Sequence, residues 1–498
     1  MQKQTFWQSL FRTKPVEAYQ REAQQTVLRR ALGRWSLVSL GIGAIIGGGI
    51  FTLTGVAAKL YAGPALALSF VIAGIACLLA ALAYAEFASI VPVEGSAYAY
   101  SYATVGEIIA WFIGWNLILE YMMGATTVAV AWSGYFEKLL HLFGIEVPYW
   151  LMNDPFTAKL KAKEMGLEPP AFSINLPGFL IAWVVTSILL RGIKETASTN
   201  NLIVFIKVGA VIFVILAGLF FINPDNWTPF IPAPEIDAKG NIHYGWSGIF
   251  TAATIVFFAY IGFDAVSTQA GEAINPRRDV PFAIVASLLI TTILYIGVSV
   301  VLTGMVPYKE LDERAPVASA FAGAGVGWAT YIITFAAVAG LISVMLVMLL
   351  GQTRIFLAMA KDGLLPERIF GYVHPIYKTP FRSTLLVGVI MSLVASFVPI
   401  VNVSELTSLG TLLAFTLVSL SVFILRLQRP DLERPYKVPL WPLVSLGGVV
   451  VNIFLMSQAR KENLRAFALW GLIGLLVYFL YSRRQSKLNR QAEVLSDL

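Results

Sequence analysis

The sequence has few charged residues and almost no cysteine. Only 13% of its 498 residues are Asp, Glu, Lys or Arg, whereas 57% are hydrophobic and the mean hydropathy is +0.73. An average soluble chain carries about 25% charged residues, so this composition indicates a membrane protein. The single cysteine, Cys77, excludes both an intrachain disulfide and a thiolate metal site.

Several functional signatures are also missing. No GxxxxGK[ST] phosphate loop is present, which argues against an ATP-driven pump. The three histidines, His141, His243 and His374, all fall in expected loops, so no histidine relay crosses the membrane. No paired nucleophile and base stands out, and we expect no enzyme activity, no cofactor and no metal. We interpret the net charge of +7 as an asymmetry of membrane-protein loops rather than as a nucleic-acid surface.

Long hydrophobic runs are abundant instead. A helix that crosses a bilayer needs about 20 mostly apolar residues, and twelve segments qualify: 35 to 60, 65 to 90, 106 to 136, 176 to 191, 195 to 222, 246 to 271, 281 to 305, 327 to 360, 383 to 399, 405 to 426, 438 to 458 and 464 to 482. With both chain ends inside, 24 of the 36 Lys and Arg lie on the inner side and 11 on the outer side. This bias predicts cytoplasmic termini. Residues 1 to 34 are polar and basic and carry no cleavable signal pattern.

Six glycines interrupt the first apolar segment, in the stretch GIGAIIGGGIFTLTG from Gly41 to Gly55. Each glycine costs about 1 kcal/mol of helix stability relative to alanine, and lipid offers no partner to a freed backbone group. We interpret the stretch as a helix break, whose free N–H groups suit a carboxylate and whose free C=O groups suit an ammonium. The alternative is that small residues let helices pack closely.

A second interrupted segment lies 211 residues further along the chain. Two apolar segments begin near Trp35 and Trp246, and the same offset maps Gly47 onto Phe258 in FFAYIGFDAVSTQAGEAINP. Transporters built from two inverted halves often break the first helix of each half near the membrane centre. The chain is therefore expected to divide into a cytoplasmic segment (1–34), a first five-helix repeat (35–222), an inverted second repeat (246–426), two added helices (438–482) and a cytoplasmic tail (483–498).

Three charged side chains in or beside apolar segments leave alternatives open. Glu86 precedes a turn with Pro and Gly, where a paired interfacial carboxylate is commoner than a functional one. Glu120 follows Asn116 by one helical turn on the same face, and meets either a substrate or a structural partner. Lys194 is either an anchor that snorkels to the headgroups or a bundle lysine that replaces a coupling sodium ion and releases a proton.

Five motifs stand in order along the chain: GIGAIIGGGIF, YAEFASIVPVEGSAYAY, NLILEY, AYIGFDAVSTQAGEAINPRRDVP and TRIFLAMAKDGLLP. Together they resemble the amino acid, polyamine and organocation transporter superfamily, and most closely its cationic amino acid transporter family. The resemblance implies an all-α integral membrane protein with twelve transmembrane helices and a leucine-transporter-like fold. Twelve helices are typical of a bacterial relative, so it also implies a multi-pass protein of the bacterial cytoplasmic (inner) membrane.

The resemblance places the substrate at the two helix breaks. The α-carboxylate would meet backbone N–H groups of Gly48 and Gly49, and Gly47 would allow its close approach. The α-ammonium would meet the backbone carbonyl groups of Ile45, Phe258 and Ile261. The ring of Phe258 would also form an aromatic gate over the substrate.

Three further residues are assigned by the same resemblance. Ser343 would line the pocket near the substrate side chain, although a serine in a membrane helix more often bonds its own backbone. Glu120 would meet the side chain of an arginine or lysine substrate. Lys194 would carry the coupled proton, as lysines at this point of the fifth helix do in proton-coupled relatives.

These observations predict a secondary transporter that imports L-amino acids, cationic or small and neutral, by proton-coupled symport with alternating access. The nearest alternative is an exchanger without net proton flow. An alternative of another class is a transporter-like nutrient receptor that binds its ligand without moving it. The expected partners are the amino acid, a proton and membrane lipids, without nucleic acid, and a small membrane subunit is left open.

Overall fold

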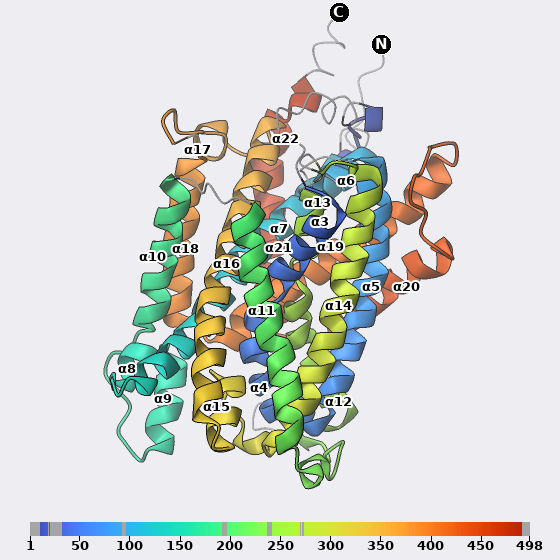
Figure 1. Ribbon diagram of the computed structural model, residues 1–498. Helices are drawn as coiled ribbons and strands as arrows, with labels where there is room; N and C mark the ends of the chain where they lie inside the picture. Colours follow the sequence, from blue (N-terminus) through green and yellow to red (C-terminus); the bar gives the residue numbers. More distant parts are fainter. Residues whose placement is uncertain are drawn as a thin grey trace, which may run out of the picture.

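The computed structural model describes residues 10–17, 19, 32–91, 96–191, 197–236, 242–268, 270, 273–377 and 379–490. The described chain is a bundle of helices that run mainly along one direction, with connections gathered at the two ends (Figure 1). A short hairpin in a connection pairs β1 (Glu235–Ile236) with β2 (Ile242–His243) antiparallel.

The longer helices coincide with the apolar segments of the sequence, and short helices lie in the connections between them. In chain order they are α3 (Arg34–Ile45), η1 (Gly49–Leu53), α4 (Thr54–Ala57), η2 (Ala58–Ala62), η3 (Gly63–Ala65), α5 (Leu66–Ile90), α6 (Ser96–Thr104), α7 (Glu107–Leu142), α8 (Tyr149–Met152), α9 (Pro155–Glu164), α10 (Leu176–Arg191), α11 (Ala197–Gly218), η4 (Leu219–Phe221), η5 (Pro224–Trp227), α12 (Gly245–Val256), η6 (Phe257–Tyr260), α13 (Ala265–Thr268), α14 (Pro276–Met305), η8 (Tyr308–Glu310), α15 (Pro316–Gly323), α16 (Gly327–Lys361), α17 (Glu367–Phe370), α18 (Phe381–Phe397), α19 (Ile400–Gln428), α20 (Trp441–Ser457), α21 (Lys461–Val477), η9 (Tyr478–Ser482) and α22 (Arg483–Gln485).

Within the described residues, eight helices are long and apolar enough to cross a membrane. One of them, Gly49–Ile90, joins the second part of the interrupted first helix to α5. Shorter apolar helices accompany them: α3, α10, α18 and α20. The chain is thus a multi-pass helical membrane protein, while the count of twelve crossings stays a prediction.

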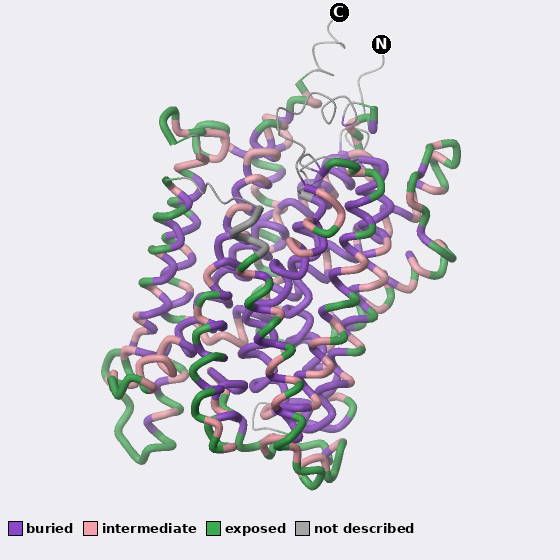
Figure 2. Tube along the Cα trace, viewed as in Figure 1, coloured by how far each residue is buried: buried purple, intermediate pink, exposed green. Residues whose placement is uncertain are grey.

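Large apolar side chains cover the outside of the bundle. On α10, Leu180, Val184 and Ile188 follow one another at helical spacing and are all exposed. Such surfaces would be unfavourable in water but face hydrocarbon in a bilayer. Figure 2 shows the buried residues concentrated in the central helices and the exposed ones along the outer helices and connections.

Helices from the first half of the chain pack along helices from the second half. α7 lies along α16, α5 along α14, and α10 along α18, which stand side by side at one edge of Figure 1. Between these pairs lie the interrupted helices: α3 packs on α14, α12 packs on α5, and η1 meets η6. The two interruptions therefore meet inside the bundle.

Both described chain ends lie at one end of the bundle. Arg12 Nη1 donates a hydrogen bond of 2.6 Å to Asn489 Oδ1, and the backbone N–H of Lys14 donates one of 3.0 Å to the carbonyl of Tyr102 in α6. The helices α8, α9 and α15 lie at the opposite end (Figure 1). This second end carries a cavity that leads toward the breaks.

Candidate functional site

The first break lies where the glycine-rich stretch predicts it. α3 ends at Ile45, and Ile46 turns into extended backbone with ψ near 103°. A π-helical turn then starts at Gly49 and continues into α4. The bend therefore separates a first half-helix, α3, which ends in carbonyl groups, from a second, η1 with α4, which begins with N–H groups. Following the orientation that the lysine and arginine bias predicts, we call them the inner and the outer half-helix.

The second break falls at the position that the sequence offset predicts. α12 ends at Val256, the tight η6 turn follows, and Ile261 is extended with ψ of 134°. Gly262 then adopts φ of +122°, a conformation that residues with a side chain rarely take. Helical structure resumes at Ala265 in α13.

The two breaks touch through glycines that admit no side chain. A Cβ atom at Gly49 would lie 2.3 Å from the Cα of Ala259. A Cβ atom at Gly262 would lie 2.8 Å from the carbonyl oxygen of Ala44. Backbone thus packs on backbone, which brings the polar groups of both breaks into one small region.

Tyr295 of α14 joins the two breaks. Its side chain is fully buried, and its hydroxyl lies 2.9 Å from the carbonyl oxygen of Ile45 and 2.8 Å from that of Ala259. A hydroxyl has a single proton to donate, so it cannot satisfy both carbonyl groups fully at once. Acceptor capacity is therefore left at the break for an ammonium group.

Lys207 of α11 reaches the first break from the side. Its side chain is fully buried, and Nζ donates a 2.9 Å hydrogen bond to the carbonyl of Gly43. Its methylene chain passes Gly340 of α16, where a Cβ atom would lie 3.0 Å away. No carboxylate among the described residues pairs with this ammonium, and an ionisable group in this setting marks a functional site.

Apolar side chains surround the glycines of the first break. A Cβ atom at Gly47 would approach Val344 of α16 to 3.1 Å, and one at Gly48 would approach Ala131 of α7 to 3.1 Å and lie 3.6 Å from Val128. The space beside the glycines is therefore bounded by hydrocarbon.

The structure brings most of the predicted substrate residues to the two breaks and places Glu120 near Asp264, just beyond the second break. Ser343 precedes Val344 and donates a 3.0 Å bond to Gly340 of its own helix. Glu120 lies eight residues before Val128 on α7, about 12 Å along the axis at 1.5 Å per residue. The predicted residues that form the two breaks are Ile45, Gly47, Gly48, Gly49, Phe258 and Ile261, and Ser343 is next to Val344, which faces Gly47.

Glu120 belongs instead to a buried acidic pair. Asp264, just beyond the second break, lies close enough for the two charges to interact, and its Oδ2 accepts a 2.8 Å bond from the Tyr121 hydroxyl. Thr411 of α19 lies close enough to interact with the Glu120 carboxylate, and backbone groups from Gly262 to Ala265 interact with that of Asp264. Asn116 does not pair with Glu120 and donates to the carbonyl of Phe112 in its own helix.

Glu86 forms a structural ion pair, the commoner of its two alternatives. Its carboxylate accepts hydrogen bonds from the guanidinium of Arg426 and a 2.8 Å bond from the backbone N–H of Val438, and Arg434 Nε lies 3.3 Å away. The residue thus fastens the connection after α19 to α5. Elsewhere in the described chain, no group of three His, Cys, Asp or Glu could hold a metal ion.

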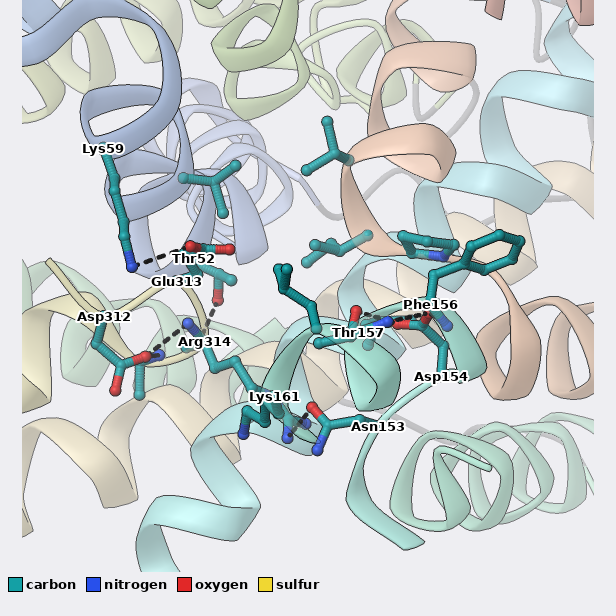
Figure 3. A pocket seen from close by; sticks show the side chains of 18 of the residues that line it. Thr52, Lys59, Asn153, Asp154, Phe156, Thr157, Lys161, Asp312, Glu313 and Arg314 are labelled. Carbon is teal, nitrogen blue, oxygen red and sulfur yellow. Dashed lines mark hydrogen bonds and ion pairs between the residues drawn. The ribbon is translucent and has the colours of Figure 1, made fainter. Parts of the chain in front are cut away.

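A cavity of about 850 Å³ opens at the end of the bundle opposite α6 and α22. Figure 3 shows charged side chains around it, including Lys59, Glu313 and Arg314. Burial, together with the nearby Arg314 cation, lowers the pKa of Lys161 in its wall. Thr52, one turn beyond the first break, belongs to its lining. The cavity is therefore a vestibule above the breaks.

The sequence analysis missed two functional candidates, Lys207 and Tyr295. Lys207 donates a hydrogen bond to the carbonyl of Gly43 and lies thirteen positions after Lys194, which is outside the described residues. Its isolation as a lysine within an apolar span was a usable signal. No comparable signal identified Tyr295, because only the folded chain reveals the two carbonyl groups that its hydroxyl reaches.

The regions of the chain that match known proteins include both helix breaks. A family profile described as amino acid permease matches residues 32–479. The chain is 44% identical over 485 residues to the branched-chain amino acid permease BcaP of Bacillus subtilis (strain 168), covering 97% of this chain and 99% of that protein. It is 41% identical over 482 residues to the methylthioribose transporter of the same organism, covering 97% and 100%. It is 40% identical over 428 residues to cationic amino acid transporter 2, vacuolar, of Arabidopsis thaliana, covering 86% and 64%.

Proposed function

Because the chain belongs to the amino acid permease family, we propose that it imports neutral L-amino acids together with protons. A permease moves its solute without transforming it, and the relatives carry the names of transporters, so the chain is a transporter and not an enzyme. The observation that carries the proposal is the contact of two broken helices beside a buried lysine.

The backbone at the breaks suits the head group of an amino acid. The N–H groups at Gly48 and Gly49, at the start of the outer half-helix, carry the partial positive charge that a carboxylate needs. Carbonyl groups of the opposite half-helices accept the ammonium: those of Ile45, Ala259, Phe258 and Ile261. A substrate with both charges is therefore held by main chain alone, as in other transporters with discontinuous helices.

The surroundings of the head group favour a neutral side chain. Val344, Val128 and Ala131 face the glycines, and a guanidinium or ammonium among them would lose its hydration without a counter-charge. Glu120, the predicted partner of a cationic substrate, lies about two turns of α7 away. The relative named branched-chain amino acid permease agrees with this preference.

We assign proton coupling to Lys207 in place of Lys194, which lies outside the described residues. A charged lysine has three N–H donors, and Nζ meets one described acceptor, the carbonyl of Gly43. Loss of the proton removes a charge that is unfavourable in a membrane interior. It also releases the inner half-helix from Lys207. Proton and substrate would then stabilise the same arrangement of the first helix, as coupling requires.

Two inverted repeats over 35–222 and 246–426 would supply the moving parts. Their corresponding members would be α5 and α14, α7 and α16, and α10 and α18, which are the pairs that pack together. Rocking of the interrupted helices against these pairs would open the site to each side in turn. The lysine and arginine bias supports cytoplasmic chain ends and a vestibule facing outward, in a bacterial cytoplasmic membrane.

Transport in liposomes tests the proposal. With an inward proton gradient and no internal amino acid, we expect concentrative uptake of labelled leucine or alanine, abolished by an uncoupler, with little uptake of arginine. Uptake only after preloading with amino acid would favour an exchanger, and binding without uptake would favour a receptor. Inhibition by methylthioribose but not by amino acids would indicate a substrate like the one for which the other relative is named.

The hydroxyl of Tyr295 provides a second prediction. Removing it in Tyr295→Phe leaves two buried carbonyl groups without their shared donor, a loss of about 1 to 3 kcal/mol. We expect leucine uptake to fall by about tenfold, mainly through a higher KM. Tyr260→Phe is the matched control, since its equally buried hydroxyl reaches the carbonyl of Phe70 in α5. Equal losses in both variants would contradict a specific role of Tyr295.

A further inference from the structure

The connection between α14 and α15 closes the floor of the vestibule. Near the end of this connection, Arg314 donates from Nη1 to Asn153 Oδ1 at 3.1 Å and from Nη2 to Ser133 Oγ at 3.0 Å. Its guanidinium also pairs with Glu137 of α7. One side chain thus ties the connection to α7 and to the loop before α9. Figure 3 shows Arg314 and Asn153 among the side chains around the cavity.

The backbone of the same connection is fastened to the outer half of the broken helix. Thr52 Oγ1 donates a 3.3 Å bond to the carbonyl of Arg314, and a Cβ atom at Gly55 would lie 2.3 Å from the carbonyl oxygen of Asp312. On the opposite side, a Cβ atom at Gly134 of α7 would lie 2.8 Å from the carbonyl oxygen of Arg314. The connection is therefore wedged between the broken helix and α7.

Asp312 holds the wedge in shape. It accepts bonds from the N–H groups of Arg314 at 2.7 Å and Ala315 at 3.0 Å, and from Ser319 Oγ at 3.0 Å. Burial acts to raise the pKa of Asp312, but these hydrogen bonds outweigh it and hold the pKa below its usual range. The carboxylate therefore remains ionised, and the turn that presents Arg314 remains fixed, at mildly acidic pH.

The wedge lies directly above the first break. Beneath it the hydroxyl of Tyr135 donates a 2.6 Å bond to the carbonyl of Phe51, so α7 and the outer half-helix also meet there. Further below, Ala131 is 1% exposed and faces Gly48. Separation of the outer half-helix from α7 along this seam would open a path from the vestibule to Gly48.

We propose that Arg314 is the outer gate of the transport path, and that the separation of its guanidinium from Glu137, Ser133 and Asn153 admits the substrate. This proposal rests on the proposed function. Opening along the seam must break the three contacts together, because all of them join the wedge to α7 or to the loop before α9. A guanidinium with several charge-assisted bonds suits this role, since its planar fork fixes one closed geometry.

Thiol labelling from the vestibule side tests the gate without transport. In a Cys77→Ser background, Ala131→Cys reports access to the break and Val130→Cys, in the vestibule wall, reports access to the vestibule. With an impermeant maleimide, Arg314→Gln should raise the labelling rate at position 131 by about tenfold. The rate at position 130 should not change, because Val130 already lines the vestibule.

A second variant keeps the test decisive if Arg314→Gln does not fold. Glu137→Gln preserves the shape of the partner but removes its charge, and should raise the same labelling rate by about threefold. Unchanged labelling at position 131 in folded protein of either variant would overturn the gate. Absence of wild-type uptake would overturn the proposed function instead, while the labelling result stands by itself.

Discussion

Leucine uptake by Lys207→Ala is expected to lose its response to an imposed proton gradient, with a fall of about 100-fold in gradient-driven rate. Exchange of internal for external leucine should persist in the same variant. The reason is that Nζ of Lys207 meets the carbonyl of Gly43 just before the first break, whereas no described side chain of the predicted head-group site depends on it. The two rates are measured in one set of liposomes, with and without preloaded leucine.

Three further variants define what the result means. Lys207→Arg keeps a charge that cannot be released in proteins, and should also fail to respond to the gradient. Lys163→Ala, on the exposed face of α9, is the control that should behave like the parent protein. Lys194→Ala tests the lysine that the sequence favours. Loss of the proton response in Lys194→Ala but not in Lys207→Ala would refute our assignment.

The breaks were predictable because their cause is local. Three consecutive glycines in an apolar segment weaken a helix wherever the segment lies, and the structure interrupts α3 after Ile45. The second break followed from a fixed offset in the chain, and η6 begins at Phe257. Both predictions depend on the order of residues rather than on their partners in space.

The charged residues were harder to assign because their partners are distant in the chain. Glu86 pairs with Arg426, 340 positions away, and Glu120 faces Asp264 rather than the glycines. The contact of Lys207 with the first helix depends on how α11 crosses α3. That crossing is set by tertiary packing, which periodicity and composition do not encode for a single chain.

Gly49→Ala is expected to reduce leucine uptake by about 100-fold, the effect of about 3 kcal/mol of strain from overpacking. The new Cβ atom would lie 2.3 Å from both the Cα and the Cβ of Ala259, so one backbone segment must move. The movement separates the N–H groups at Gly48 and Gly49 from the carbonyl groups of the second break. Uptake is measured at saturating and at low leucine, because a separated site should show a raised KM.

Two alanine controls distinguish this effect from a general intolerance of helix changes. Gly209→Ala lies in α11 with no atom within 4 Å of its new Cβ, and should leave uptake unchanged, since alanine favours helix. Gly47→Ala meets Val344 at 3.1 Å, a side chain that can give way, and should lie between the two. Wild-type uptake in Gly49→Ala would mean that the breaks separate without cost, and the shared head-group site would then be wrong. Leucine uptake that falls in the order Gly209→Ala, Gly47→Ala, Gly49→Ala would show that transport depends on the backbone contact itself, because the three variants differ in what the added carbon atom meets.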